Sequence, residues 1–126
     1  MSARHGDLRV LVVDDQPHFR RAAAKLIAAV DGFRLVGEAS TGEEAVDLVA
    51  TLGAELVLMD VRMPGMGGVE AARCILATSP ATRVVLVSSS DVNALPSAVK
   101  SCGAERFLRK DQLGATTLAE LRSATT

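Results

Sequence analysis

Short runs of hydrophobic residues recur along the chain and are separated by segments in which hydrophobic positions are three or four residues apart. The runs cover residues 8–13, 33–36, 56–59, 84–87 and 107–108. The first, third and fourth are almost continuously apolar, which is typical of parallel strands that are covered on both faces. The second and fifth are shorter and mixed, as strands at the edges of a sheet often are. We therefore predict five strands, with the second and the fifth at the edges.

Helical spacing of hydrophobic residues fills most of the intervals after these runs, in residues 19–30, 45–52, 69–76 and 118–121. Thr41 and Glu44 have the spacing of a capping box in front of the second of these segments. The interval before the fifth strand is less regular. Pro96 falls inside it, and proline is tolerated only in the first turn of a helix. We predict there either a short helix that starts late and ends before Gly103 or a kinked helix, and we favour the short one.

The elements therefore follow one another as strand and helix, repeated five times. This alternation implies a parallel sheet with helices on both faces, connected by right-handed crossovers. Five strands match the α/β flavodoxin-like, doubly wound (βα)5 fold with the strand order 2-1-3-4-5. In such a sheet, binding sites lie beyond the carboxyl ends of the strands, near the switch point between the first and third strands. With 126 residues, we expect a single domain over residues 1–126, with its core at about 8–122.

Composition and charge narrow the classes of function. The net charge is −1, and Trp and Tyr are absent, so we expect no direct nucleic-acid binding by this chain. No run reaches the ~18 apolar residues of a membrane span, and residues 1–6 lack the apolar run of a signal peptide. Cys74 and Cys102 are widely separated and form no metal-type cluster with His5 or His18. We therefore expect free thiols, a cytoplasmic location and no membrane partner.

Three aspartates directly follow strands that are neighbours in the predicted sheet. Asp14 and Asp15 come after the first strand, and Asp60 comes after the third. Like charges about 4 Å apart repel by ~4 kcal/mol at an effective dielectric of 20, so such a cluster needs a counter-charge. A hard divalent cation with oxygen ligands meets this need. Mg²⁺ fits best, because it takes one or two carboxylates and keeps room for waters and phosphate oxygens.

Two further polar side chains are predicted to reach the same edge of the sheet. Ser88 follows the fourth strand and Lys110 follows the fifth. A metal, a carboxylate, a hydroxyl and an ammonium are the groups that stabilise a phosphoryl group in transfer, and a carboxylate acceptor gives an aspartyl phosphate. Each residue alone has a common structural explanation, such as a helix cap or a turn. The prediction rests on their joint placement at four strand ends.

Four segments resemble the response-regulator receiver family. The resemblance covers nearly the whole chain, from about Leu8 to Leu121, and the order and spacing of the four segments make it highly specific. Residues 10–15 (VLVVDD) resemble its acidic strand and 56–68 (LVLMDVRMPGMGG) its phosphoacceptor segment. Residues 84–88 (VVLVS) resemble the strand with the switch hydroxyl, and 103–111 (GAERFLRKD) the segment with the switch aromatic and the lysine.

The resemblance implies a phosphoacceptor and a metal site. Asp60 would accept a phosphoryl group from a partner histidine kinase in a two-component system. Asp15 and Asp60 would bind Mg²⁺ directly, Asp14 would help through a water molecule, and the backbone carbonyl of Arg62 would be a further ligand.

The resemblance also implies a conformational switch. Lys110 would contact the phosphoryl oxygens, Ser88 would move to the phosphate, and Phe107 would follow inward. The surface formed by the fourth helix, the fifth strand and the fifth helix would then rearrange, which is a two-state element biased by a local charge. The expected partner beyond the kinase is a downstream effector domain or protein, and a homodimer is a further option.

Some positions depart from the usual residues of the family. Gly67 stands where the family usually has an Asp or Asn that helps to cap the third helix, so we expect a looser loop there. Ser88 replaces the more common threonine and keeps its hydroxyl. Phe107 replaces the more common tyrosine and offers no phenol for a hydrogen bond. Pro96 falls on the predicted switching surface.

Four interpretations stay open. The leading one is a signalling switch with slow self-dephosphorylation rather than an enzyme with turnover. A second is the isolated regulatory domain of a transcription factor, because Ser88 and the Lys110–Asp111 pair resemble the branch with a C-terminal helix-turn-helix domain. A third is a phosphatase with an Asp nucleophile, which Arg62 disfavours because such enzymes usually have a second aspartate at that position. A fourth is a degenerate receiver that acts only as a binding module.

Overall fold

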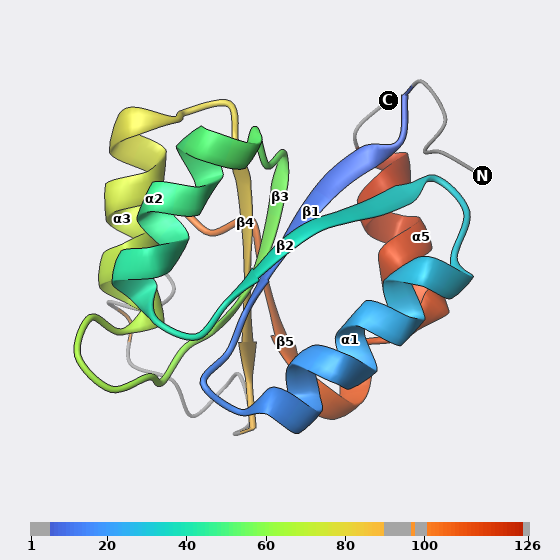
Figure 1. The fold of residues 1–126 in the computed structure, drawn as a ribbon, viewed down its shortest axis with the longest axis horizontal. Coiled ribbons are helices and arrows are strands. Elements are labelled where there is room, and N and C mark those ends of the chain that lie inside the picture. Colours follow the sequence, from blue (N-terminus) through green and yellow to red (C-terminus); the bar gives the residue numbers. More distant parts are fainter. Residues whose placement is uncertain (1–5, 90–96, 98–100, 125–126) are drawn as a thin grey trace.

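Five parallel strands form one sheet in the order β2-β1-β3-β4-β5 in the computed structural model (Figure 1). The structure describes residues 6–89, 97 and 101–124. Both the predicted strand order and the edge positions of the second and fifth strands are confirmed. The strands are β1 (Leu8–Val13), β2 (Phe33–Ala39), β3 (Leu56–Asp60), β4 (Arg83–Ser88) and β5 (Arg106–Arg109).

Two strands end on residues that the sequence placed just beyond them. Asp60 is the last residue of β3 and pairs with Val87 in the parallel ladder, and Ser88 is the last residue of β4 and pairs with Arg109. The prediction stopped short because a polar residue ends the apolar run, although its backbone still takes part in the ladder. The edge strand β2 likewise extends three residues beyond the predicted run.

Helices cover both faces of the sheet. In Figure 1, α2 and α3 lie on one side of the strands, and α1 and α5 lie on the other. The predicted fourth helix, with Pro96 in it, lies outside the described residues. No helix in the described ranges is long and apolar enough to span a membrane. The helices are α1 (Pro17–Ala29), α2 (Gly42–Leu52), α3 (Gly68–Thr78) and α5 (Ala115–Ser123), with a short 3-10 helix, η2, at Lys110–Gln112.

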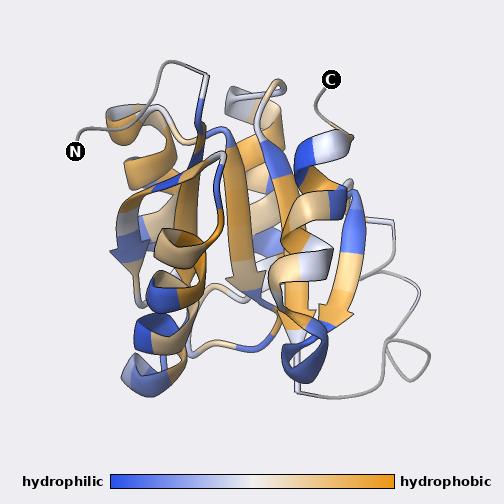
Figure 2. Cartoon of the chain, turned by 90° about the vertical axis from the view of Figure 1, so that its right-hand side faces the viewer, coloured by the Kyte–Doolittle hydropathy of each residue, from blue (hydrophilic) through white to orange (hydrophobic). Residues whose placement is uncertain are grey.

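Alternating residues of the central strands supply two hydrophobic cores. Leu11 and Val13 belong to the core under α2 and α3, whereas Val10 and Val12 belong to the core under α1 and α5. This explains why β1 reads as a continuous apolar run, since successive side chains point to opposite buried faces. Figure 2 shows the hydrophobic strands between helices that are more hydrophilic on their outer sides. Both cysteines are free thiols, as predicted.

Of the two bonds in the predicted capping box in front of α2, the one to the Thr41 side chain is confirmed. Thr41 is the N-cap, and its Oγ1 accepts a hydrogen bond of 3.1 Å from the Glu44 N–H. The Glu44 carboxylate accepts from the N–H of Ser40, at 2.8 Å, one residue before the N-cap. The helix therefore begins where the sequence predicts, because its first free N–H groups are satisfied there.

Candidate functional site

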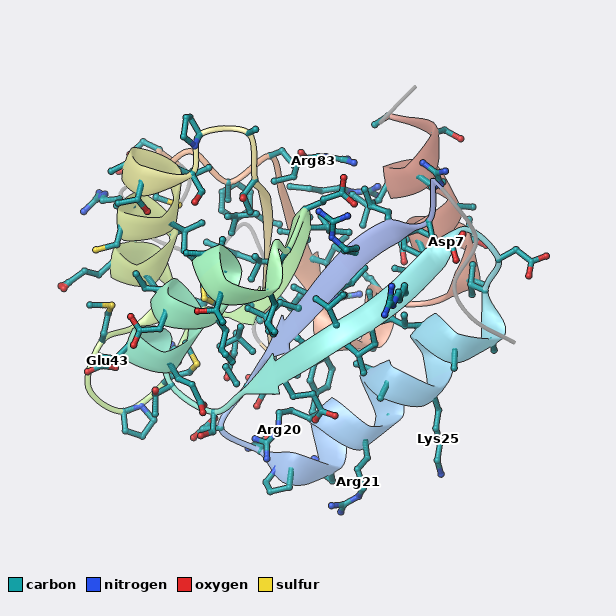
Figure 3. All side chains as sticks on the ribbon, turned by 45° about the horizontal axis from the view of Figure 1, so that its top comes forward. Asp7, Arg20, Arg21, Lys25, Glu43 and Arg83 are labelled. Carbon is teal, nitrogen blue, oxygen red and sulfur yellow. The ribbon has the colours of Figure 1, made fainter. Side chains whose placement is uncertain are left out.

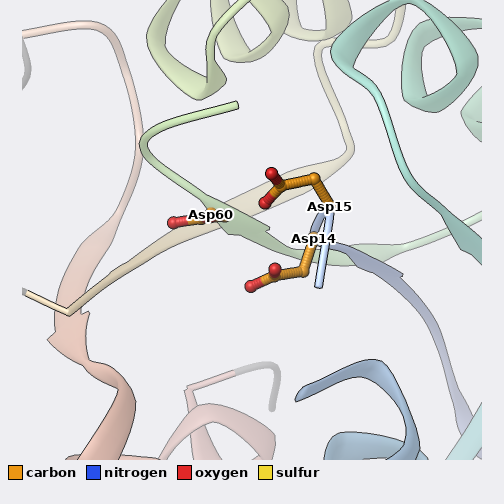
Figure 4. Close-up of side chains that lie close together, drawn as sticks. All are labelled: Asp14, Asp15 and Asp60. Atoms are coloured by element: carbon orange, nitrogen blue, oxygen red, sulfur yellow. The ribbon is translucent and has the colours of Figure 1, made fainter. Parts of the chain in front are cut away.

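Three aspartate side chains meet at the carboxyl ends of β1 and β3, as the sequence predicts (Figure 4). One carboxylate oxygen from each of Asp14, Asp15 and Asp60 lies within 4.8 Å of the others. A cavity of about 230 Å³ opens beside them. Its lining residues come from the ends of four strands and the turns that follow: Asp15, Gln16, Asp60, Arg62, Ser88, Ser89 and Lys110.

Asp14 is fully buried, and its polar atoms are held from several directions. Its backbone N–H donates to Ala39 at 3.0 Å, and its Oδ1 accepts from the Gln16 N–H at 2.8 Å. Its Oδ2 accepts no hydrogen bond of good geometry among the described residues, although the Lys110 ammonium lies 2.8 Å away. Asp14 is not the cap of α1, because Gln16 occupies that position and makes no side-chain cap.

This donor set fits a hard divalent cation. Three carboxylates converge, one of them, Asp15, is exposed to the cavity, and Oδ2 of Asp14 retains unused acceptor capacity. Oxygen ligands of this kind suit Mg²⁺, which keeps waters and substrate oxygens in its shell. Arg62 lines the same cavity, and its N–H lies 3.4 Å from Oδ1 of Asp60. The role of the Arg62 carbonyl as a ligand stays a prediction.

Asp60 has an unusual protonation equilibrium for an aspartate. Its pKa is raised to about 6, first because burial disfavours the charged form and then because the negative charge of Asp14 is close. The Lys110 ammonium and the Arg62 N–H lower the pKa, and the charge of Asp15 raises it slightly. Positive charge brought into the cavity therefore favours the ionised form of Asp60.

Lys110 stands at the start of η2, directly after β5, and reaches across the sheet edge. Its Nζ lies 2.8 Å from Oδ2 of Asp14 and 3.9 Å from Oδ2 of Asp60. Gln16 accepts a hydrogen bond from it at 3.3 Å, and the ring of Phe19 lies 4.6 Å from the ammonium. Neither Gln16 nor Phe19 was predicted from the sequence as part of the site. Their spacing of three at the start of α1 was the available signal that they share a face.

The two predicted switch residues lie on neighbouring strands. Ser88 is buried at the end of β4 and lines the cavity. Phe107 is half-buried on β5, opposite Leu86, and packs against the core under α2 and α3. Because side chains alternate along a strand, Leu86 and Ser88 project from the same face of the sheet, on which Phe107 also lies. The two residues therefore share one face of the sheet, and their switching role stays a prediction.

The turn from β3 into α3 brings Gly68 against the backbone of Asp60 at the end of β3. Gly67 is the N-cap of α3 and provides no side-chain cap, and the looser loop expected here stays a prediction. The importance of Gly68 was not predicted from the sequence. A Cβ at this position would lie 2.2 Å from the backbone oxygen of Asp60, so only glycine fits without a shift of the backbone. The Gly68 N–H donates to Val61 at 3.0 Å, which holds this approach in place.

Comparisons with known proteins show which family this chain is similar to. The profile of the family described as "Response regulator receiver domain" matches residues 10–122. The response regulator GacA of Pseudomonas aeruginosa is 37% identical over 103 residues, which are 82% of this chain and 48% of that protein. The response regulator UvrY of Escherichia coli K12 is 34% identical over 116 residues, 92% of this chain and 53% of that protein. The chain thus spans about half the length of these relatives.

Solved structures of response regulators superpose on most of this chain. The response regulator domain of CheB from Thermotoga maritima superposes with a TM-score of 0.81 at 30% identity, covering 93% of this chain and 94% of that one. A two-component response regulator of the LuxR family from Aurantimonas sp. SI85-9A1 superposes with a TM-score of 0.81 at 29% identity, covering 93% and 83%.

Proposed function

This chain belongs to the response regulator receiver domain family, and we propose that its phosphoacceptor is Asp60. The observation that carries the proposal is the convergence of a buried acceptor carboxylate, two further carboxylates and an ammonium at one cavity. Helix capping and turn formation do not require these groups to meet. Phosphoryl transfer does, because it depends on positioning and on neutralising the charge of the phosphoryl oxygens.

The proposed reaction transfers one phosphoryl group to the carboxylate. A carboxylate oxygen of Asp60 forms a bond to phosphorus, the bond from phosphorus to the imidazole nitrogen of a histidine kinase breaks, and the imidazole takes the electron pair. Asp15, Asp60 and the Arg62 carbonyl would hold Mg²⁺, with Asp14 acting through a water. When bound, Mg²⁺ supplies positive charge to the phosphoryl oxygens.

The remaining residues then respond to the new charge. Lys110 lies near enough to Oδ2 of Asp60, at 3.9 Å, to contact a phosphoryl oxygen there. The Ser88 hydroxyl would donate to the phosphoryl group and Phe107 would follow inward, so that the surface around the fourth helix, β5 and α5 changes. Such a switch needs no turnover, and we expect only slow self-dephosphorylation.

The setting of this switch is also a proposal. We place it in a cytoplasmic two-component phosphorelay, with a histidine kinase upstream and an effector domain or protein downstream, and with homodimerisation as an option for output. A second candidate is the regulatory part of a transcription factor. It is favoured by the coverage of about half of GacA and UvrY, and by the likeness to a LuxR-family regulator. The mass of the native gene product separates the two.

Intact-mass analysis tests the acceptor directly. The protein is incubated with acetyl phosphate or phosphoramidate and Mg²⁺, and we expect the wild type to gain one phosphoryl group. Asp60→Ala should gain none, whereas Asp47→Ala, which removes a carboxylate from α2 away from the cavity, should behave as the wild type does. An unmodified wild type would overturn the active switch and favour a degenerate receiver that acts as a binding module.

A further inference from the structure

We propose that Arg20 is a positioning residue for the acidic pair, one that fixes Asp14 so that the carboxylates can share a divalent cation. The inference rests on the proposed function, because it concerns the same metal site. Arg20 lies at the beginning of α1, beside the ends of β1 and β2 (Figure 3). It lines no part of the cavity, so its effect on a cation passes through the residues that it holds.

The guanidinium of Arg20 joins three elements. Its Nη1 donates to the backbone carbonyl of Asp14 at 2.5 Å, and its Nε lies 3.3 Å from Oε1 of Glu38 near the end of β2. The Arg20 side chain is only 19% exposed, so these contacts are partly shielded from water. The Asp14 N–H also donates to Ala39 of β2. Both backbone polar groups of Asp14 are therefore tied to β2, one directly and one through Arg20 and Glu38.

The β1–α1 turn gains support from this arginine because the side-chain cap that usually starts a helix is missing. Gln16, the N-cap of α1, makes no side-chain cap, and the first turn of the helix holds no acidic residue. The side-chain bonds that hold the turn include the one from the Gln16 N–H to Oδ1 of Asp14 and the one from Arg20 to the Asp14 carbonyl. Groups that orient metal ligands from outside the coordination shell commonly change metal affinity by about 10- to 100-fold when they are removed.

Charge and positioning predict opposite results at this residue. The positive charge of Arg20, which lies against the backbone of Asp14, repels a Mg²⁺ ion bound nearby, so the loss of the Arg20 charge alone should tighten Mg²⁺ binding. If Arg20 instead positions Asp14, its loss should weaken Mg²⁺ binding although a repelling charge has gone. Lysine keeps the charge but lacks the planar fork that reaches two acceptors at fixed angles. Arg20→Lys should therefore restore binding only in part.

The experiment measures Mg²⁺ affinity of the whole chain by isothermal titration calorimetry at fixed ionic strength. We expect Arg20→Met to weaken Mg²⁺ binding about tenfold, and Arg20→Lys to fall between it and the wild type. Arg21→Met is the matched control, because Arg21 is the next residue of α1, is exposed and carries the same charge. The Mg²⁺ affinity of Arg21→Met should be equal to that of the wild type or up to about twofold higher.

Thr41→Ala separates positioning from loss of stability. It removes the cap of α2 and lowers stability away from Arg20, so its Mg²⁺ affinity should remain that of the wild type. Arg20→Lys covers the case that Arg20→Met does not fold, because it keeps the charge, so weaker binding by this variant reflects lost positioning and not lost charge. Equal or tighter binding by Arg20→Met, or by Arg20→Lys in its place, would overturn the inference. Failure of the wild type to bind Mg²⁺ or to be phosphorylated would overturn the proposed function instead.

Discussion

Lys110 pairs more closely with Asp14 than with Asp60, and this choice of partner shapes the electrostatics of the site. Its Nζ is 2.8 Å from Oδ2 of Asp14 and 3.9 Å from Oδ2 of Asp60. Because the attraction falls with distance, the charge of Asp60 is less compensated by Lys110 than the charge of Asp14 is. Its pKa is correspondingly raised to about 6, through burial and the charge of Asp14. Without a bound cation, the site thus holds ionised Asp60 at a cost in folding free energy.

That cost predicts the pH dependence of an Asp60→Asn variant in EDTA. The pKa of Asp60 is about 6 in the folded protein, against 3.8 for an aspartate in an unfolded chain, so the folded protein binds the extra proton between these values. The stability of the wild type therefore falls as the pH rises through about 4 to 6 and stays low above pH 6. Asparagine carries no charge, so the variant should be more stable at pH 8, by up to about 3 kcal/mol.

Urea unfolding followed by circular dichroism measures this difference, since the chain has no Trp or Tyr for fluorescence. The gain of Asp60→Asn over the wild type should shrink towards zero at about pH 4, where the carboxyl is largely protonated in the folded protein. Asp47→Asn, on α2 and away from the cavity, serves as the control and should change little at either pH. A gain that is the same at pH 4 and pH 8 would contradict the electrostatic cause.

At the scale of elements, the sequence predicts those helices and strands that a local pattern of residues is enough to locate. The apolar run of residues 56–59 located β3 except for its last residue, Asp60, and the Thr41–Glu44 pair located the start of α2. The extent of β2 was missed because it is an edge strand, paired only with β1, and its last residues include Gly37 and Glu38 without an apolar pattern. The hydrophobic pattern of β2 itself does not show that pairing with β1 extends the strand to Ala39.

The same reason separates the parts of the site that could be predicted from those that could not. The aspartates, Ser88 and Lys110 follow from strand ends alone, because parallel strands bring their carboxyl ends to one edge. The contacts of Gln16, Phe19 and Arg20 depend on how α1 sits over that edge. That placement is set by the packing of α1 on the sheet, and no spacing in the sequence states it.

The crossing of α3 over β3 gives a prediction with a matched control in adjacent residues. Gly68→Ala should lower the free energy of unfolding by about 1–3 kcal/mol, because the added Cβ would meet the Asp60 backbone oxygen at 2.2 Å and the backbone must shift. Gly67→Ala should change the free energy of unfolding by less than about 1 kcal/mol, because the lower freedom of the unfolded chain is offset by the weaker capping of alanine at an N-cap position. At Gly67 the nearest atom would be 3.5 Å away and the φ angle, −74°, suits any residue.

Denaturant unfolding of the two variants checks this expectation, and acetyl phosphate labelling adds a second readout. Because the Gly68 clash falls on Asp60 itself, Gly68→Ala should also slow phosphorylation, whereas Gly67→Ala should not. Equal stability of the two variants would show that the crossing is more tolerant than the structure indicates.

At the scale of the whole molecule, the site lies at the carboxyl ends of the strands, next to the two hydrophobic cores that these strands separate. The four strand ends that supply the site residues belong to strands whose side chains fill the cores on both faces of the sheet. Ser88 is the last residue of β4, and the strand beside it, β5, leads directly to Lys110 and then towards α5. A charge placed on Asp60 can therefore bias the packing of β5 without large movements of the central strands, which are buried on both sides.

This arrangement predicts that Ser88 couples phosphorylation to β5 and α5. In the phosphorylated wild type we expect hydrogen exchange to change at Leu108 and along α5. Ser88→Ala should still gain one phosphoryl group, but it loses a hydrogen bond to a charged group, worth about 1.5–3 kcal/mol. A loss of about 1.4 kcal/mol shifts a two-state equilibrium about tenfold, so the exchange changes should mostly disappear. Thr51→Ala, which removes an exposed hydroxyl from the last turn of α2, should keep them. If phosphorylated Ser88→Ala shows the full change, the coupling runs through other residues and Ser88 has no switching role.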